Sequence, residues 1–376
     1  MQYGKFVTVT VREDSYRYFL PSNMNSKLID IEGFSKISEE ITLLLGRLDS
    51  IVRFLPDKEL FIYMYVRKEA ILSSQIEGTQ SSLHDVFAHE NKLALQDGSN
   101  EDIEEVSSYI KALNSGAEIL KSGKFPFSIR LLKMIHRDLM QNSRGIKKEP
   151  GAIRTSQNWI GGSRPGNAIY VPPAPEHVME LLSDMEKFYH NSRISTPILC
   201  GMMHGQFETI HPFLDGNGRL GRLIIPMILC DRGMLEDPIL YISYQLKLCR
   251  SEYYRCLQDL RVKGSWNEWI EFFLNSMKES VLDAYRNCSK INELLMKDSK
   301  RIKLLPRSDN IMRLYEYMKK MPLVYIPSAS KKLNLSPHTI KKSLKILQDM
   351  EIVVETTNKL RDREYVYKAY YDILDN

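Results

Sequence analysis

The chain has 376 residues, a length that indicates two or three domains. Of these residues, 43% are apolar and 26% are charged, which is typical of a soluble globular protein. This composition excludes collagen-like, coiled-coil and disordered proteins. No apolar stretch approaches the roughly 18 residues of a membrane-spanning helix, and the first residues hold no apolar core of a secretory signal. The net charge of +5 is uneven, because residues 300–376 hold 16 Lys and Arg against 9 Asp and Glu, a net of +7, so the other 299 residues sum to −2.

The first 140 residues predict mostly helices. Residues 4–20 alternate between apolar and polar side chains in places, which indicates a strand at the start. Apolar residues at helical spacing predict helices within 37–95, with a break at Gly78, and a further helix over 102–120. Ser128 is the expected N-cap of a helix that runs through Met140.

The chain changes character over residues 145–175, where glycine and proline are crowded. Residues 152–159 and 168–171 are predicted to be the two arms of a hairpin with a Gly/Pro-rich turn between them. Helical patterns resume at Glu176 and continue, with breaks, to about Met296. The predicted fold class of this part is therefore mainly α, with one hairpin-like insertion.

The basic tail shows the pattern of a small separate domain. Residues 299–308 are basic and contain a proline, so we expect a linker there. Three predicted helices follow, the third beginning at Ser336 as N-cap with Pro337 at its first position. A strand–loop–strand pattern over 352–367 ends this part, and the whole pattern resembles a winged helix-turn-helix.

One stretch, HPFLDGNGRLGR from His211 to Arg222, carries the chemistry. Two glycines flank Asn217 in a tight turn, and a helical pattern follows it. The backbone N–H groups and the dipole at the start of a helix favour anions, so this turn is a phosphate cradle. Arg219 and Arg222 are three residues apart, so they project from one side of the helix toward further phosphates.

Two further side chains of this stretch have the chemistry that a phosphoryl-type transfer needs. Asp215 lies just before the turn, where its carboxylate is placed to hold a hard cation such as Mg²⁺ against the phosphates. His211 titrates near neutrality and suits a general base.

Two other sequence patterns resemble known motifs, but the residues around them do not fit those motifs. Gly216, Gly218 and Gly221 also spell the dinucleotide pattern G-x-G-x-x-G, but no apolar strand precedes them. His136 begins an H-R-D-L sequence like that of a kinase catalytic loop, but it lies in a helical pattern and no D-F-G follows. We therefore expect His136 to be an ordinary helix residue.

Residues 211–222 match the Fic family signature, HxFx(D/E)GNGRxxR, at every specified position. This resemblance implies a helical Fic core that transfers AMP from ATP to a hydroxyl of a target protein, with His211 as the base and Asp215 as the holder of Mg²⁺. It also implies that the phosphates of ATP are bound by the turn and by the two arginines, that is, by Gly216, Asn217, Gly218, Arg219 and Arg222.

A second stretch resembles the inhibitory motif of the same family, (S/T)xxxE(G/N). It runs from Ser73 to Gly78 and lies N-terminal to the Fic core, the arrangement of class II. The resemblance implies that Glu77 pairs with Arg222 and misplaces the γ-phosphate. This is electrostatically reasonable, because the carboxylate occupies the arginine that the triphosphate needs.

The hairpin-like insertion corresponds to the flap of the family. An exposed strand edge binds an extended peptide by β-addition, so we expect the flap to position the target hydroxyl near His211 through Thr155, Gln157, Trp159, Ile160, Gly161 and Gly162. Tyr253 and Tyr254 are weak candidates for contacts to the adenine, because tyrosines at such spacing more often belong to a core.

These patterns predict three parts: a helical region with the inhibitory motif over 1–122, a Fic catalytic core over 123–298, and a winged-helix-like domain over 299–376. The expected ligands are ATP, Mg²⁺ and a target protein, which includes the protein itself, and a homodimer agrees with the class. Five cysteines without C-x-x-C spacing indicate reduced thiols and a cytoplasmic protein that does not contact membranes.

Two other functions remain open at this point. The same site would remove AMP from a modified protein if Glu77 oriented a water molecule. Alternatively, residues 300–376 bind DNA through His338, Lys341, Lys342 and Lys345, and the Fic core only senses nucleotide.

Overall fold

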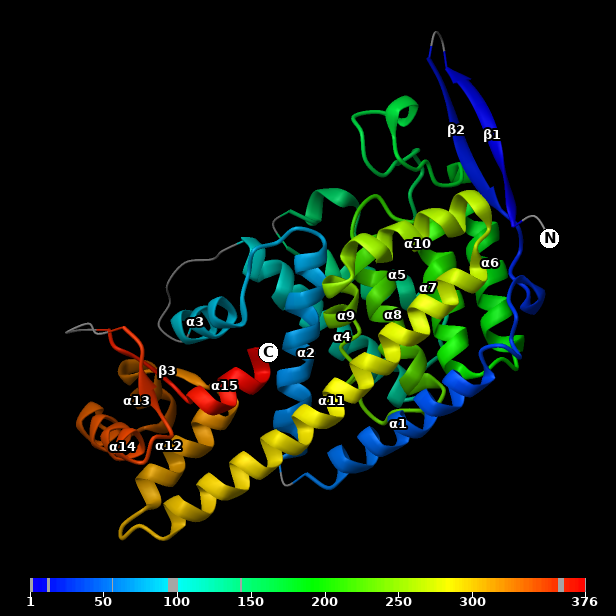
Figure 1. Ribbon diagram of the computed structural model, residues 1–376. Coiled ribbons are helices and arrows are strands. Elements are labelled where there is room, and N and C mark those ends of the chain that lie inside the picture. Colours follow the sequence, from blue (N-terminus) through cyan, green and yellow to red (C-terminus); the bar gives the residue numbers. More distant parts are fainter. Residues whose placement is uncertain are drawn as a thin grey trace.

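The computed structural model describes residues 3–11, 14–55, 57–93, 101–142, 144–357 and 362–375. A body of packed helices fills its centre, a two-stranded hairpin projects from one end, and a smaller module is attached at the other end by one long helix (Figure 1). The helices of the body are α1 (Ser35–Arg53), α2 (Lys58–Ile76), α3 (Leu83–Leu93), α4 (Glu101–Lys121), α5 (Ile129–Leu139), α6 (Pro175–Asn191), α7 (Thr196–Ile210), α8 (Asn217–Asp231), α9 (Ser243–Leu248), α10 (Arg250–Lys263) and α11 (Trp266–Lys303). The predicted mainly α fold is thus confirmed.

Helices α7 and α8 form the centre of this body, because they are buried on nearly every side. Residues 197–210 of α7 are all buried, as are residues 219–229 of α8. A helix that is buried all round is surrounded by other helices. Residues 211–216, which join α7 to α8, are therefore fixed at both ends in the rigid core, and residues 217–222 form the first turns of α8.

The N-terminal strand is one arm of a hairpin. Strands β1 (Gly4–Val11) and β2 (Asp14–Pro21) pair antiparallel, with Gly4 opposite Pro21. Tyr18 of β2 packs with Val171 and Ala174 in a small apolar cluster. The hairpin therefore leans on the segment between α5 and α6, which was expected to be the flap.

That segment is less regular than the sequence predicted. Residues 152–159 and 168–171 do not form strands, and one antiparallel bridge, between Ile160 and Tyr170, joins the two arms. A short 3₁₀ helix, Pro165–Asn167, lies at its tip. Gly161 and Gly162 both have φ near +70°, which interrupts an extended strand, so the ladder stops after a single pair.

The C-terminal module contains α12 (Asp309–Lys320), α13 (Ile326–Leu333) and α14 (Pro337–Asp349), as the sequence predicted. Strands β3 (Leu323–Tyr325), β4 (Val354–Glu355) and β5 (Glu364–Val366) form an antiparallel sheet in the order β3-β5-β4. The Ser336 hydroxyl accepts a hydrogen bond from the Thr339 N–H and caps α14, as expected. Helix α15 (Lys368–Asp375), which was not predicted, returns toward α2 and α11 (Figure 1).

The expected linker at 299–308 is in large part helical. Helix α11 continues through Lys303 without a break, over 38 residues. The basic residues that suggested a linker instead stand in the last turn of a helix, where the dipole favours cations. The division into three domains remains a prediction.

The described helices do not include one that is both long enough and apolar enough to cross a membrane.

The junction between α11 and the module contains a buried polar contact that should stabilise the fold. The Tyr367 hydroxyl donates to Asp298 Oδ2 over 2.6 Å, and Asp298 is 3% exposed. We expect Asp298→Ala to lower the free energy of unfolding by about 1–3 kcal/mol, because the buried hydroxyl loses its acceptor. Asp298→Asn, which keeps an acceptor, should cost less. Urea denaturation checks this, and equal losses in both variants would contradict it.

Candidate functional site

The site is built around the loop that joins the two central helices. Helix α7 ends at Ile210, and His211 follows it with φ of +50° in the left-handed region. Gly216 has φ of +74° and begins α8, where the absence of a side chain makes this conformation easy to adopt. These two turns direct the loop back across the N-terminus of α8.

The loop is held from inside by Asn217 and Phe213. The Asn217 side chain accepts from the Phe213 N–H over 2.9 Å and donates to the Phe213 carbonyl over 2.8 Å. The ring of Phe213 is fully buried and stacks on His136 with 3.7 Å between ring centroids. Asn158 of the flap segment also donates to the Phe213 carbonyl, over 2.9 Å. The loop is thus ordered before any ligand arrives.

His136, expected to be an ordinary helix residue, supports this loop. Its Nδ1 accepts from the Gly151 N–H over 2.8 Å, and its Nε2 donates to the Asp215 carbonyl over 3.0 Å. Burial lowers the pKa of His136 to about 4, so this neutral tautomer persists at pH 7. Sequence reasoning missed this role because the partners lie far away along the chain.

His211 lies half-buried in the wall of the cleft beside the loop. Its Nδ1 is buried and has no hydrogen-bond partner in the described part of the chain. Burial, together with the positive charges of Arg261 and Arg154, lowers the pKa of His211 well below its usual range. The imidazole is therefore neutral at pH 7 and able to accept a proton.

Arg222 is a buried and fully paired cation of the site. Its side chain is 1% exposed and donates to Ser73 Oγ over 2.9 Å, to the Ser73 carbonyl over 2.9 Å and to Glu77 Oε1 over 2.6 Å. Ser73 and Glu77 are four residues apart at the end of α2, so they lie on the same face of the chain. The two residues of the predicted inhibitory motif thus meet the second arginine of the loop.

The Glu77 carboxylate also reaches the N-terminus of α8. A β-carbon added at Gly218 would lie 2.2 Å from Glu77 Oε1, so only glycine allows this approach. The start of a helix attracts negative charge through its free N–H groups and its dipole. Glu77 therefore stands where an anion would bind.

Arg219 is also paired, with a partner that the sequence did not reveal. It donates to Glu105 Oε2 of α4 over 2.8 Å, and it lies 3.8 Å from Asp215 Oδ1. Glu105 is further held by Arg144, over 3.2 Å. No pattern in the sequence connects α4 with this loop, so Glu105 is a tertiary contact that only the structure gives.

Glu208 is a second residue that sequence reasoning missed. It is 5% exposed and lines the cleft, and its Oε1 has no hydrogen-bond partner among the described residues. Burial raises the pKa of Glu208 to about 7. Its position three residues before His211 was the available signal.

The cleft has a volume of about 610 Å³ and brings most of the predicted site residues together. Tyr253 and Tyr254 of α10 line it, but the Tyr253 hydroxyl is engaged with His204 Nε2 over 2.9 Å. Tyr254 is 40% exposed. The residues predicted and found in its lining are Glu77, His211, Asp215, Gly216, Asn217, Gly218, Arg219, Arg222, Tyr253, Tyr254, Trp159, Ile160 and Gly161.

The remaining predicted flap residues do not line the cleft. Thr155 and Gly162 are exposed, and the Gln157 amide donates to the Pro172 carbonyl over 2.9 Å. Trp159, Ile160 and Gly161 thus form the part of the segment that faces the loop.

Within the described residues, no three His, Cys, Asp or Glu side chains gather into a group that would hold a metal ion by itself. Asp215 offers a single carboxylate, 49% exposed, beside the start of α8. Mg²⁺ is commonly held by one or two carboxylates together with substrate phosphates. The donor set therefore fits a cation that is shared with a bound nucleotide.

Comparisons with known proteins show which relatives the chain resembles. Residues 41–118 match the family model for the Fic/DOC family N-terminal region, and residues 126–229 match the model for the Fic/DOC family. The protein adenylyltransferase Fic of Drosophila erecta is 30% identical over 165 residues, which are 43% of this chain and 30% of that protein. The Drosophila melanogaster protein of the same name is 28% identical over the same length. The chain thus matches less than a third of the length of these relatives.

Two solved structures share the fold. A Fic family protein from Desulfovibrio desulfuricans G20 has a TM-score of 0.54 and 19% identity, and the match covers 93% of this chain and 98% of that one. A Fic domain containing signalling protein from Bacteroides thetaiotaomicron has a TM-score of 0.52 and 19% identity, and covers 68% of this chain and 97% of that one. With both family models matched, residues 41–118 and 126–229 of the chain belong to the Fic/DOC family, and the fold is shared with these two structures.

Proposed function

We propose that the protein is an adenylyltransferase that transfers AMP from ATP to a hydroxyl of a target protein and that Glu77 inhibits it. The proposal rests mainly on one observation: the neutral imidazole of His211, the N-terminus of α8 and the two arginines Arg219 and Arg222 line the same cleft. The name of the Drosophila relatives, protein adenylyltransferase, supports the same activity for the matched part of the chain.

In this proposal the loop binds the triphosphate and His211 activates the target. The N–H groups at Gly216–Gly218 hold phosphate oxygens, and Arg219 and Arg222 neutralise the charge of the β- and γ-phosphates. The neutral His211 takes the proton of the target hydroxyl. The hydroxyl oxygen forms a bond to the α-phosphorus while the bond to the bridging oxygen breaks, and pyrophosphate leaves. Asp215 would hold Mg²⁺, which supplies further charge neutralisation on the phosphates.

Glu77 opposes this arrangement in two ways. It occupies Arg222, and its carboxylate stands at the N-terminus of α8. A triphosphate that enters the cleft with Glu77 in place meets a like charge and lacks one of its cations. The γ-phosphate is then displaced, and the α-phosphorus is not aligned with the incoming hydroxyl.

Removing the carboxylate should therefore activate the protein. We expect Glu77→Gly to increase AMP incorporation from labelled ATP, into itself or into lysate proteins, by about tenfold or more, the effect of restoring one charge-assisted phosphate contact. The double variant Glu77→Gly with His211→Ala is the matched control and should show no transfer. Unchanged incorporation by a Glu77→Gly protein that still binds ATP would exclude the inhibitory role.

The role of His211 as a base requires a neutral ring at physiological pH. Because burial lowers its pKa, the free protein should keep His211 unprotonated from pH 8 down through 6.5, the ordinary value for histidine. Its ring signal in an NMR titration, assigned with His211→Asn, should stay constant over this range. A midpoint near 6.5 would contradict the proposed environment. As pH falls below 6.5, the unfolded chain binds a proton at His211 and the folded chain does not. The free energy of unfolding therefore decreases with falling pH in this range.

The same cleft would serve removal of AMP, in which Glu77 orients a water molecule toward the phosphorus. The position of the Glu77 carboxylate at the N-terminus of α8 is the observation that favours this second direction. Incubating the unaltered protein and Glu77→Gly with an AMP-modified target separates the two directions. Only the unaltered protein should release AMP if Glu77 has this role.

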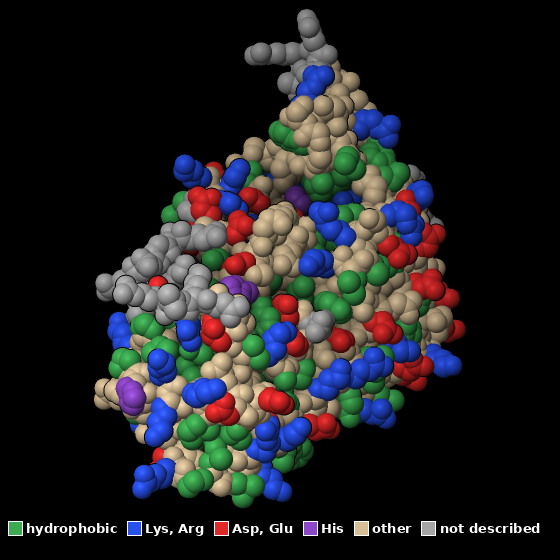
Figure 2. Space-filling view, turned by 60° about the vertical axis from the view of Figure 1, so that its left-hand side comes forward, with side chains coloured by type: hydrophobic (Ala, Val, Ile, Leu, Met, Phe, Trp, Pro, Cys, Tyr) green, Lys and Arg blue, Asp and Glu red, His purple; other side chains and the backbone are tan. Residues whose placement is uncertain are grey.

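A further proposal concerns the C-terminal module, whose order of helices and strands supports a winged helix. Lys and Arg side chains are gathered at the lower left of Figure 2, where this module comes forward. On α14, the residues His338, Lys341, Lys342 and Lys345 are all exposed on one face. Such a row of cations supports binding to DNA phosphates.

Charge reversal on α14 tests this. If the module binds DNA, replacing both Lys341 and Lys342 by Glu should weaken a gel shift at low salt and lower the salt dependence of the remaining binding, because each lost phosphate contact reduces the slope by about 0.9. Lys297→Glu on the exposed side of α11 is the control. A shift of equal strength in the double variant would exclude α14 as the contact.

A further inference from the structure

A second cavity lies at the opposite end of α2 from the catalytic cleft. It has a volume of about 450 Å³ and is bounded by the start of α2, the last turns of α11, and one residue each of α12 and α15. Because α2 has 19 residues at 1.5 Å each, about 28 Å separates its two ends. This junction cavity therefore shares no wall with the residues proposed for catalysis.

The interior of the junction cavity is largely apolar. Leu60 and Phe61 of α2, and Ile291 and Leu295 of α11, contribute side chains that are otherwise buried. At its mouth Met296 and Leu304 are 59% and 79% exposed, respectively. An apolar ligand body that entered the cavity would cover both.

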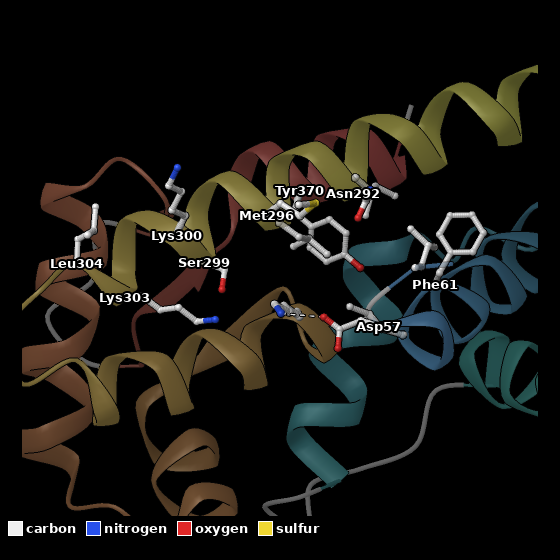
Figure 3. A pocket seen from close by; sticks show the side chains of 14 residues that line it. Asp57, Phe61, Asn292, Met296, Ser299, Lys300, Lys303, Leu304 and Tyr370 are labelled. Atoms are coloured by element: carbon white, nitrogen blue, oxygen red, sulfur yellow. Dashed lines mark hydrogen bonds and ion pairs between the residues drawn. The ribbon is translucent and has the colours of Figure 1, made fainter. Parts of the chain in front are cut away.

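Two polar groups of the cavity, from Ser299 and Lys303, lie toward the end of α11. Figure 3 shows the ammonium group of Lys303 and the hydroxyl of Ser299 directed toward the interior, while Lys300 points away. Asp57, the acidic residue of the lining, is paired with Lys319 over 2.8 Å. Glu316 pairs with the same lysine over 2.9 Å, so the Lys319 charge is satisfied.

Lys303 has no such partner. Within the described parts of the chain, no acidic side chain pairs with it or with Lys300. A largely apolar cavity into which the unpaired cation of Lys303 and the hydroxyl of Ser299 are directed is complementary to a molecule that has an apolar body and one negative group. The same charge disfavours a cationic amphiphile of equal length.

We propose that the junction cavity binds a small amphipathic carboxylate. Its hydrocarbon chain lies between α2 and α11 against Leu60, Phe61 and Leu295, and it covers Met296 at the mouth. Its carboxylate accepts hydrogen bonds from Lys303 Nζ and Ser299 Oγ. No bond is made or broken, and the site is independent of the proposed transfer of AMP.

Calorimetric titration of the full chain with decanoate, below its aggregation concentration, tests the proposal. We expect saturable binding of one molecule per chain. Decylamine has the same chain length and the opposite charge, so it should bind at least about tenfold more weakly. Absence of saturable decanoate binding, or equal binding of decylamine, would overturn the proposal.

Two charge reversals on α11 locate the carboxylate. Lys303→Glu places a negative charge at the proposed head group and should weaken decanoate binding by about tenfold or more. Lys297→Glu makes the same change on a residue that is exposed and outside the lining, and should leave binding unaltered. Because Lys303 is exposed, its replacement should not impair folding, which a thermal melt verifies. Equal effects of the two reversals would refute the assignment of Lys303.

Discussion

The buried charge of Arg222 is the constraint on which the rest of the site depends. A guanidinium with 1% exposure is stable only if an anion accompanies it, because an unpaired buried charge costs several kcal/mol. In this structure Glu77 supplies that anion, and Ser73 supplies two further acceptors. The chain therefore places an arginine that is proposed to bind nucleotide in the core and provides its counter-charge from a neighbouring helix.

The cost of leaving buried polar groups unpaired also explains why so many hydrogen bonds and ion pairs hold the loop. Arg219 is paired with Glu105, Asn217 ties together the backbone of Phe213, and His136 holds the Asp215 carbonyl. Each contact satisfies a buried polar group that would otherwise be left without a partner. Rigid placement of the donors matters because a phosphate site works by alignment and charge, with little covalent chemistry of its own.

Sequence patterns predicted the local features of this protein well. The helices, the Ser128 and Ser336 caps and the contiguous loop 211–222 depend on neighbours in the chain, and those neighbours can be read directly. The motif at Ser73 and Glu77 was found because a known family carries the same spacing. Glu105 and Glu208 were missed because their importance comes from packing between helices distant in sequence. The flap was predicted as two hairpin arms around a Gly/Pro-rich turn. The sequence did not show that Gly161 and Gly162 both adopt a positive φ, which ends the strand pairing after one bridge.

The attachment of Glu77 to α2 has a consequence for how the site responds to nucleotide. A carboxylate on the same chain acts at an effective concentration set by geometry, commonly in the millimolar range or above, so dilution does not release it. Under the proposed function, ATP must therefore compete with a tethered group, and its intrinsic affinity is multiplied by the fraction of molecules in which Arg222 is free. Whatever moves the end of α2 changes that fraction without touching the nucleotide site.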